Sequence, residues 1–506
     1  MENLVEIRLE PTGRRLRVAS GAPLQSALAE HGVEFPCGGG GRCGACRVKV
    51  LRGELPMTAD DTGVLSPALL ADGWRLACRA EAHTDVTLEV GQWDSVVLAD
   101  DSVFEFEPRP GLGIAIDLGT TTMVAQLVDF STGRVLGVRS ALNPQAVHGS
   151  DVMSRLEAAL AGHALDQLVA MLRESVGRLV SDLVVAGEVE PKGLRRVVVA
   201  GNTVMQHFFC GLDPRPLATW PFRPASGAAH HCRAGELGWP VRDELAVTFL
   251  PPLGGFVGSD LLCGVLATGL HRRETPSVLV DLGTNGEILV GNRDRILCAS
   301  TAAGPAFEGG GIGMGMRATT GAVHRVRAQG NGFCATVFGG AAPRGICGSG
   351  LIDAVAVALD LGLLESSGRI AGDARTLEIA APVVLTQQDI RQLQLAKAAV
   401  AAGLGILRRR FGDGAGRSAT VWLAGAFGNH VDPASASRIG LVDAEASRIR
   451  PAGNTSLLGA KIALLAGDTA GYDYESILSR VEHVPLADDP AFAERYVEEM
   501  PFPGGR

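Results

Sequence analysis

The fold of most of this chain is decided by Gly-Ile-Ala-Ile-Asp-Leu-Gly-Thr-Thr-Thr, residues 113–122, and by Ser-Val-Leu-Val-Asp-Leu-Gly-Thr-Asn-Gly-Glu, residues 277–287. Each stretch starts as an apolar run typical of a buried strand and ends in an aspartate and a glycine turn. The two Asp-Leu-Gly-Thr copies, at Asp117 and Asp281, lie 164 residues apart. A repeat of this kind predicts two duplicated α/β halves that face each other across a cleft.

The chemistry of the two copies indicates phosphate binding. Glycines and threonines after the strand offer backbone N–H groups and hydroxyls to phosphate oxygens. A carboxylate at the end of a buried strand is unfavourable without a cation or hydrogen-bond donors. Two such aspartates can hold Mg²⁺ through water and orient a hydrolytic water. We therefore predict that Asp117 and Asp281 are catalytic residues. A later glycine-containing strand, residues 421–429, strengthens this interpretation.

A separate module precedes these copies. Residues 4–18 alternate polar and apolar side chains around a Pro-Thr-Gly turn, which predicts a β-hairpin, and residues 23–31 suit a short helix. Next comes a glycine-rich stretch with three cysteines, followed by a strand and later by a fourth, isolated cysteine. The four cysteines are Cys37, Cys43, Cys46 and Cys78.

The spacing of these cysteines, C-x5-C-x2-C-x31-C, indicates a metal centre. Its first gap is one residue longer than in the C-x4-C-x2-C…C pattern of plant-type ferredoxins. A glycine-rich loop can wrap closely around two irons and give backbone N–H donors to the cluster sulfurs. A structural zinc site is the alternative, although zinc ribbons usually have two C-x2-C pairs and this module has one. The module resembles a β-grasp [2Fe–2S] ferredoxin domain, and the resemblance implies that all four cysteines bind one cluster.

The composition is that of a globular protein. Of the 506 residues, 46% are apolar and 20% are charged, enough for a sizeable core. The formal charge of −9 and the lack of a long basic run argue against nucleic-acid and anionic-membrane partners. No apolar stretch reaches the length of a membrane span, and the first residues lack the features of a signal peptide. We expect a cytoplasmic protein.

The two phosphate-binding copies and the later glycine strand resemble the superfamily of acetate and sugar kinases, Hsp70 and actin (ASKHA). The resemblance implies an α/β fold in which two RNase H-like ATPase domains surround a nucleotide cleft, behind the β-grasp ferredoxin domain. It also implies ATP and Mg²⁺ as ligands. By this resemblance the phosphate-binding residues are Gly119, Thr120, Thr121, Thr122, Gly283 and Thr284, and the residues beside the adenosine are Gly425 and Gly428.

Six further motifs, in this order behind a [2Fe–2S] module, are similar to those of the reductive activators of corrinoid-dependent proteins. They are Asn143-Pro-Gln with Asp151 to Arg155, Gly201 to Met205, Gly254 to Asp260, Ala302 to Gly309, Gly345 to Gly350, and Asp389 to Lys397. The resemblance implies that one electron passes from the cluster to an inactive cobalt(II) corrinoid protein, at the expense of ATP. The cobalt(I) product restores methyltransferase activity. The implied partners are this corrinoid protein, a low-potential electron donor and a second copy of the chain.

Three other functions share parts of the pattern. A ferredoxin-fused small-molecule kinase would phosphorylate a hydroxyl or a carboxylate. An activator of hydroxyacyl-CoA dehydratases would hold a [4Fe–4S] cluster between two ATPase subunits, and the sequence has no convincing cysteines for that cluster. A redox sensor would only bind ATP. ATP turnover that is stimulated by a corrinoid protein favours the activator over all three.

The change of composition along the chain predicts its domain organisation. We expect a [2Fe–2S] ferredoxin-like domain at 1–92, a linker at 93–112, a first ATPase half at 113–275 and a second ATPase half at 276–506. Residues 81–112 carry eight acidic residues and one basic residue. This acidic rim is either solvated surface or a docking site for a redox partner.

For several other reactive residues, the sequence allows both a functional and a purely structural role. Glu287 and Glu308 either position water or Mg²⁺, or face solvent from a loop. Cys347 is expected to be a packed, inert thiol in a tight turn. Residues 389–397 are expected to start an amphipathic helix that packs on the ATPase. The histidines for which core or surface roles are favoured over cobalt binding are His207, His230 and His231.

Overall fold

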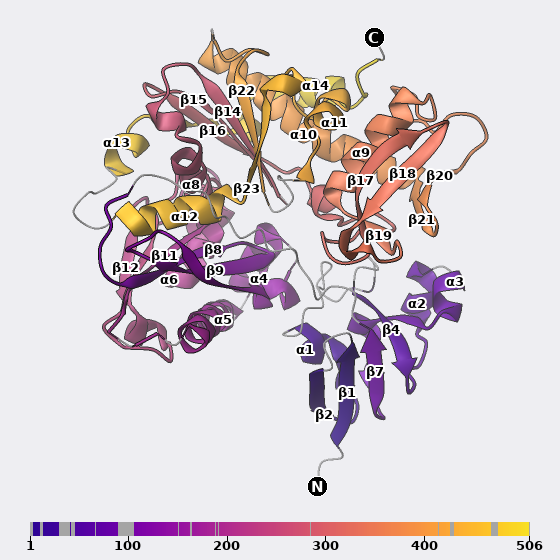
Figure 1. Ribbon diagram of the computed structural model, residues 1–506, viewed down its shortest axis with the longest axis horizontal. Coiled ribbons are helices and arrows are strands. Elements are labelled where there is room, and N and C mark those ends of the chain that lie inside the picture. Colours follow the sequence, from indigo (N-terminus) through magenta and orange to yellow (C-terminus); the bar gives the residue numbers. More distant parts are fainter. Residues whose placement is uncertain are drawn as a thin grey trace.

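The computed structural model describes most of the chain, whose elements form an N-terminal domain and a larger body of two halves (Figure 1). The described residues are 4–10, 14–29, 41, 46–65, 67–89, 106–149, 151–161, 164–187, 189–190, 192–283, 285–412, 414–425, 430–466 and 474–504. Within this part of the chain, no helix combines the length and the apolar character needed to cross a membrane.

The N-terminal domain is built on a five-stranded sheet of the β-grasp type. Its elements are β1 (Leu4–Glu10), β2 (Arg14–Ala19), β3 (Ala22–Pro23), α1 (Leu24–Ala29), β4 (Arg47–Arg52), α2 (Ala59–Val64), α3 (Pro67–Ala71), β5 (Trp74–Leu76), β6 (Glu81–Ala82) and β7 (Val86–Glu89). The first two strands form the expected antiparallel hairpin, and β7 lies parallel to β1, in the order β2-β1-β7-β4-β5. Because side chains of a strand alternate between its faces, Ile7 and Leu9 are both buried, against Leu24 and Leu28 of α1.

The first large half is built on a six-stranded mixed sheet. Its strands are β8 (Leu112–Leu118), β9 (Thr122–Asp129), β10 (Val135–Leu142), β11 (Leu194–Gly201), β12 (His230–Arg233) and β13 (Ala246–Phe249). In the order β10-β9-β8-β11-β13-β12, neighbours β8, β9 and β10 are antiparallel, whereas β11 and β13 run parallel to β8. The helices are α4 (Val152–Leu160), α5 (Ala164–Ala186), α6 (Thr203–Cys210), α7 (Arg215–Ala218) and α8 (Ser259–Thr268).

The second large half repeats this arrangement. Its sheet consists of β14 (Ser277–Leu282), β15 (Gly286–Gly291), β16 (Ile296–Thr301), β22 (Thr420–Ala424), β23 (Ile449–Gly453) and β24 (Val481–His483). In the order β23-β22-β14-β15-β16-β24, neighbours β14, β15 and β16 are antiparallel, and β22 and β23 run parallel to β14. Five strands thus correspond in order and direction to β8, β9, β10, β11 and β13. This correspondence confirms the two duplicated α/β halves.

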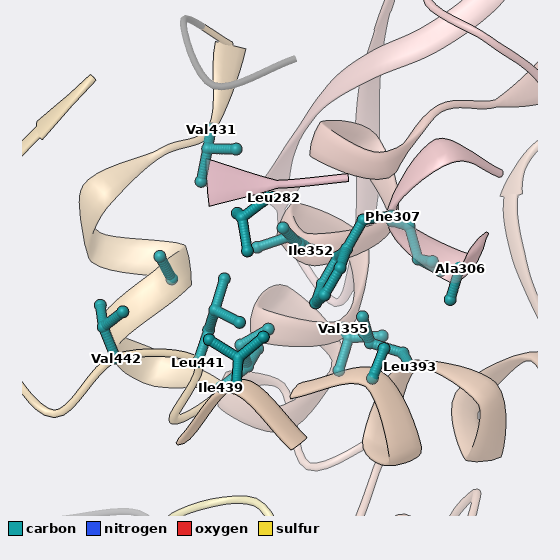
Figure 2. Packing of buried hydrophobic residues seen from close by; sticks show 14 of the residues in the cluster. Leu282, Ala306, Phe307, Ile352, Val355, Leu393, Val431, Ile439, Leu441 and Val442 are labelled. Atoms are coloured by element: carbon teal, nitrogen blue, oxygen red, sulfur yellow. The ribbon is translucent and has the colours of Figure 1, made fainter. Parts of the chain in front are cut away.

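A mixed α/β insertion follows β16, and its buried side chains form one core with those of β14 and β15. The further elements of the second half are β17 (Ala322–Gln329), β18 (Gly332–Val337), β19 (Gly345–Ile346), α9 (Gly348–Asp360), β20 (Thr376–Ala380), β21 (Val383–Thr386), α10 (Gln387–Phe411), α11 (Pro433–Arg438), α12 (Thr455–Ala466), α13 (Tyr474–Leu478) and α14 (Pro490–Glu498). Figure 2 shows the ring of Phe307 beside Ile352 and reaching toward Val355 of α9, close to Leu393 of α10. This buried packing fixes the position of the adjacent Glu308.

The two halves also share a core. Helix α12 comes from the end of the chain, yet it packs against α8 and against strands β8 and β11 of the first half. The guanidinium of Arg196, on β11, donates hydrogen bonds to the carbonyls of Ala463 and Leu464, and Arg109 donates to the carbonyl of Leu465 at 2.8 Å. The C-terminal segment therefore belongs to the packing of the first half.

Candidate functional site

A cavity of about 240 Å³ lies between the two halves, where the loops after β8 and β14 approach each other. Both copies of the repeated pattern contribute to its wall. The predicted residues that line it are Asp117, Gly119, Thr120, Thr121, Thr122, Asp281, Gly283 and Gly425. Two other predicted residues, Thr284 and Gly428, lie outside the described residues. The fold thus brings residues separated by more than 300 positions to one cleft.

Asp117 lies near the end of β8 and reaches the cavity. Its two carboxylate oxygens accept hydrogen bonds from the Asn454 amide and the Ser456 hydroxyl, both at 2.8 Å. Burial nevertheless raises the pKa of Asp117, because the two hydrogen bonds only partly offset the loss of water around the charge. A cation beside Asp117 would favour its charged form.

Four more carboxylates share the cavity with Asp117, namely Asp260, Asp281, Glu287 and Glu308. Asp281 and Glu287 are paired across β14 and β15, and Asp260 lies in the first turn of α8. Burial is the main cause that raises the pKa of Asp260 to about 7 and the pKa of Asp281 to about 8, and neighbouring negative charges add to it. Burial, and then the charges of Asp260 and Asp281, also raise the pKa of Glu287. Clustered carboxylates of this kind favour a divalent cation, because their charges repel one another without it.

The arrangement fits Mg²⁺ bound together with phosphate. In the described part of the chain, no three acidic, histidine or cysteine side chains converge closely enough to hold a metal ion by themselves. Mg²⁺ commonly takes one or two carboxylates from a protein, and waters and substrate phosphates complete its shell. Asp117 and Asp281 face the cavity from opposite halves, so they are placed for this role.

Polar side chains hold the loop after β8 in place. The side-chain amide of Asn143 donates to the Gly119 carbonyl at 3.0 Å, and its backbone N–H donates to the Thr121 carbonyl at 2.9 Å. The amide of Asn202, which caps α6, donates to the Thr120 hydroxyl at 2.8 Å. A Cβ at Gly119 would come within 2.5 Å of a backbone carbonyl of the same loop, so the turn requires glycine. Contacts within the protein therefore hold this loop in one conformation.

The opposite side of the cleft has a similar constraint. Gly425 follows β22 with a φ of 108°, and a Cβ there would lie 2.3 Å from the Leu282 carbonyl and 3.1 Å from the Asp281 carboxylate. Any larger residue would push into the strand that carries the second aspartate. Gly425 thus keeps the loop after β22 close to Asp281.

Sequence reasoning gave no individual role to several residues that line the cavity. For Asp260, the only indication of a role in the sequence was its position at the end of the Gly254–Asp260 motif, just before an apolar helical run. Asn454 and Ser456 had no signal, because they lie 337 and 339 residues from Asp117. Arg317 also lines the cavity. Burial lowers its pKa to about 10, so the guanidinium is still charged near neutral pH and able to bind phosphate.

The remaining candidates have defined surroundings. Glu287 lies within β15 and is 9% exposed, so the interpretation of a solvent-facing loop carboxylate is wrong for it. Glu308 lines the cavity at the end of a short 3-10 turn. Cys347 is packed as expected, because its thiol lies 3.4 Å from the Val323 carbonyl and 3.4 Å from the Ser349 hydroxyl, and burial raises its pKa.

The histidines occupy structural or surface positions. His207 is buried, with one ring nitrogen 2.7 Å from the Thr203 carbonyl and the other accepting from the Ala225 backbone N–H at 2.9 Å. Both nitrogens are therefore used within the fold. His230 and His231 lie on β12, where the second is exposed.

Two of the four predicted cluster cysteines belong to the described part of the N-terminal domain. Cys46 directly precedes β4, and Cys78 lies in a short turn after β5. A hydrogen bond with the Cys46 thiol lowers the pKa of Cys78 to about 7, against the opposing effect of burial. The two thiols meet although they are far apart in the sequence, which fits two ligands of one cluster. Cys37 and Cys43 lie outside the described residues.

A β-grasp ferredoxin domain joined to a duplicated α/β body with a carboxylate-lined cleft defines a class: iron–sulfur proteins with an ASKHA-type ATPase. Three family models match the chain in this order. They are the 2Fe-2S iron-sulfur cluster binding domain at residues 7–83, the RACo middle region at 112–273, and the C-terminal ASKHA domain of RACo at 275–506.

Similarity to individual proteins shows to which family within this class the chain belongs. The chain is 35% identical over 440 residues to the corrinoid activation enzyme RamQ of Eubacterium limosum, a match that covers 80% of this chain and 74% of the relative. It is 27% identical over 423 residues to the Co(II) methylated amine-specific corrinoid protein reductase of Methanosarcina barkeri, with 77% of each chain covered. A solved structure of a reductive activator for corrinoid, iron-sulfur protein matches 99% of this chain and 98% of its own, with a TM-score of 0.71 and 27% identity. The chain belongs to the family of corrinoid-protein reductive activators.

The raised pKa values of the cleft predict a pH dependence of ligand stabilisation. Without a ligand, Asp260 and Asp281 become charged as the pH rises through about 7 and about 8. Because these pKa values lie above the value of about 4 for an unfolded chain, the ligand-free protein loses stability as the pH rises from about 4 to about 8. Mg-ADP supplies a cation to the charged forms, so its stabilising effect should grow between about pH 6 and about pH 8.5. Thermal unfolding with and without Mg-ADP measures the effect, and a gain in Tm that stays constant or falls with pH would contradict it.

Proposed function

We propose that this enzyme reduces an inactive cobalt(II) corrinoid protein to cobalt(I) by ATP-dependent transfer of one electron, which restores a methyltransferase. The observation that carries the proposal is a cleft lined by buried carboxylates and by both Asp-Leu-Gly loops, in the same chain as a ferredoxin domain. Relatives named for corrinoid activation support it over most of their length. We further propose that a low-potential electron donor reduces the protein, that the protein forms a homodimer, and that it acts in the cytoplasm.

In this proposal the cleft binds and hydrolyses Mg-ATP. Asp117 and Asp281 would hold Mg²⁺, which would favour attack of water on the phosphate, and Asn454 and Ser456 keep the Asp117 carboxylate in position. Arg317 lies in the cavity wall, where its charge favours phosphate. The residues proposed to bind phosphate are Gly119, Thr120, Thr121, Thr122, Gly283 and Thr284, and those proposed to flank the adenosine are Gly425 and Gly428.

ATP is needed because the electron moves uphill. Cys37, Cys43, Cys46 and Cys78 would hold a [2Fe–2S] cluster of the plant type, which would supply one electron at about −400 mV. Cobalt(II) of a corrinoid is harder to reduce, and a gap of about 200 mV costs about 5 kcal/mol per electron. We propose that the ATPase body docks the oxidised corrinoid protein and weakens a cobalt ligand, which raises the cobalt potential. Hydrolysis then releases the repaired partner.

The visible spectrum of cobalt tests this function. Anaerobically purified protein is mixed with a low-potential reductant and a cobalt(II) corrinoid protein from the same organism, with and without Mg-ATP. We expect cobalt(I) only when Mg-ATP is present. No cobalt(I) with several corrinoid proteins, despite an intact [2Fe–2S] spectrum, would contradict the proposal. Phosphorylation of a small molecule would then favour a kinase, and the absence of any ATP turnover would favour a sensor.

A further inference from the structure

A second cavity lies in the second half of the ATPase body, apart from the cleft between the halves. It holds about 1120 Å³, and α10, α11 and α14, which lie together near the C-terminus, form much of its wall (Figure 1). Among the described residues, none lines both this cavity and the cleft. Pockets that hold a small-molecule ligand usually measure about 300 to 1,000 Å³, so this cavity has room for one.

One face of α10 forms a side of this second cavity. Ala401, Leu404, Gly405 and Arg408 line it, and a spacing of three or four residues places them on the same face of the helix. Glycine inside a helix is unfavourable, but a Cβ at Gly405 would lie 3.0 Å from Nη1 of Arg495, on α14. Glycine therefore leaves room for the Arg495 guanidinium to lie against α10, three residues before Arg408.

The guanidiniums of Arg408 and Arg495 have N–H groups that no described residue accepts. Nη1 of Arg408 donates to the Asp443 carbonyl at 2.6 Å. Nε and Nη2 of Arg408, and Nε of Arg495, are buried and have no hydrogen-bond partner in the described part of the chain. Nε and Nη2 lie on one edge of the guanidinium, and such an edge can donate to two oxygens of one anion. Buried donors of this kind are unfavourable until a ligand accepts their hydrogen bonds.

Two other arginines of the wall are already paired with carboxylates. Nε of Arg438 lies 2.6 Å from the Asp360 carboxylate, and Nε of Arg417 lies 3.2 Å from the Asp443 carboxylate. Burial lowers the pKa of Arg408, the charge of Asp443 opposes this effect, and the charge of Arg417 adds to it. An anion beside Arg408 would favour its charged form and offset the repulsion from Arg417.

The two remaining carboxylates of the wall have other surroundings. Glu445 is exposed, and its carboxylate lies 3.5 Å from the Ser447 hydroxyl. The charge of Glu499 acts on Lys397, where it opposes the lowering of the lysine pKa by burial. Neither glutamate forms an ion pair with an arginine of the cavity among the described residues. The unused N–H groups thus face an anion site that the protein itself does not fill.

We propose that this second cavity binds a phosphate group, whose oxygens accept hydrogen bonds from Arg408 and Arg495. A phosphate monoester has three terminal oxygens and between one and two negative charges near pH 7. The free edge of Arg408 serves two of these oxygens, and Nε of Arg495 serves the third. A carboxylate has two oxygens and one charge, so it would leave a buried donor unused. Both inorganic phosphate and a small organic phosphate ester have the required chemistry.

Isothermal titration calorimetry of the full chain tests this site, with glucose 6-phosphate, inorganic phosphate and acetate as probes at one ionic strength. We expect Arg408→Lys to weaken phosphate binding about tenfold or more, because lysine keeps the charge but lacks the two-donor edge. Arg495→Lys, on a different helix, should have the same direction. Tighter binding of glucose 6-phosphate supports an ester as the occupant, and equal binding supports free phosphate. No binding of either phosphate, or acetate binding as tightly, would overturn the proposal.

Two control variants show where the phosphate binds. Arg409 is exposed and is the next residue of α10, but it is not among the residues that line the cavity, so Arg409→Lys should leave the affinity unchanged. Arg317 lines the cleft between the halves, and Arg317→Lys should also leave it unchanged. Phosphate binding that survives Arg408→Lys and Arg495→Lys but is lost in Arg317→Lys would belong to the cleft and would overturn the proposal. Thermal unfolding confirms that each variant is folded.

Discussion

Replacing Asp117 with asparagine is expected to lower the rate of ATP hydrolysis by about 100-fold or more. The exchange keeps the size of the side chain but removes the charge that would hold Mg²⁺ and its water. It also turns an acceptor into an amide donor opposite Asn454 and Ser456, both of which donate to Asp117. ADP release measured with and without a corrinoid protein reports the loss. A rate within about threefold of the wild type would contradict the catalytic role.

The control for this variant is Asp129→Asn. Asp129 lies at the far end of β9 and accepts hydrogen bonds from Ser131 and Thr132 in a surface turn. The substitution is chemically identical but distant from the cleft, so it should leave ATP hydrolysis unchanged. The [2Fe–2S] spectrum should be that of the wild type in both variants, because neither site touches the N-terminal domain.

The second large effect is expected from Cys78→Ser, which should abolish cobalt(I) formation while ATP hydrolysis persists. Serine is a poor ligand for iron where a thiolate is required, so the cluster should be lost or strongly depleted. The proximity of the Cys78 and Cys46 thiols indicates that removing one of them disrupts a shared centre. Iron content, the visible spectrum and ATP turnover are measured on the same preparation.

Cys334→Ser is the matched control for the cysteine variant. Cys334 is exposed on β18 of the second half and is not among the cluster residues. This variant should retain both the cluster and cobalt(I) formation. Loss of ATP hydrolysis in Cys78→Ser, or an intact [2Fe–2S] spectrum in it, would contradict the separation of an electron-carrying domain from an ATPase body.

Those parts of the site that depend on local sequence were predictable. The apolar run, the aspartate and the glycine turn around Asp117 lie within ten residues, and the same holds for Asp281. Strand periodicity places each carboxylate at a strand end, and duplication places both ends at one cleft. The β-hairpin and the short helix of the N-terminal domain were predictable for the same reason, since each is formed by neighbouring residues.

The partners of the aspartates could not be predicted in this way. Asn454 and Ser456 reach Asp117 only because helix α12 crosses from the end of the chain to the first half. Nothing in the residues around Asn454 encodes the contact, which depends on how two distant sheets pack. The contact between the N-terminal domain and the second half could not be predicted either. Glu89 and Arg344 are ordinary charged residues in the sequence, and they form an ion pair only in the folded protein.

The crossing of α12 sets the time during synthesis at which Asp117 can acquire its two hydrogen-bond donors. A ribosome adds about 5 to 20 residues per second, so Asn454 follows Asp117, 337 residues earlier, after roughly 17 to 70 s. During that interval β8 and β11 lack the helix that covers them, and their apolar side chains offer a surface to chaperones. Asp117 meanwhile lacks both of its donors. If Asp117 has the proposed catalytic role, a nascent chain gains full ATP hydrolysis only after Asn454 and Ser456 have been added.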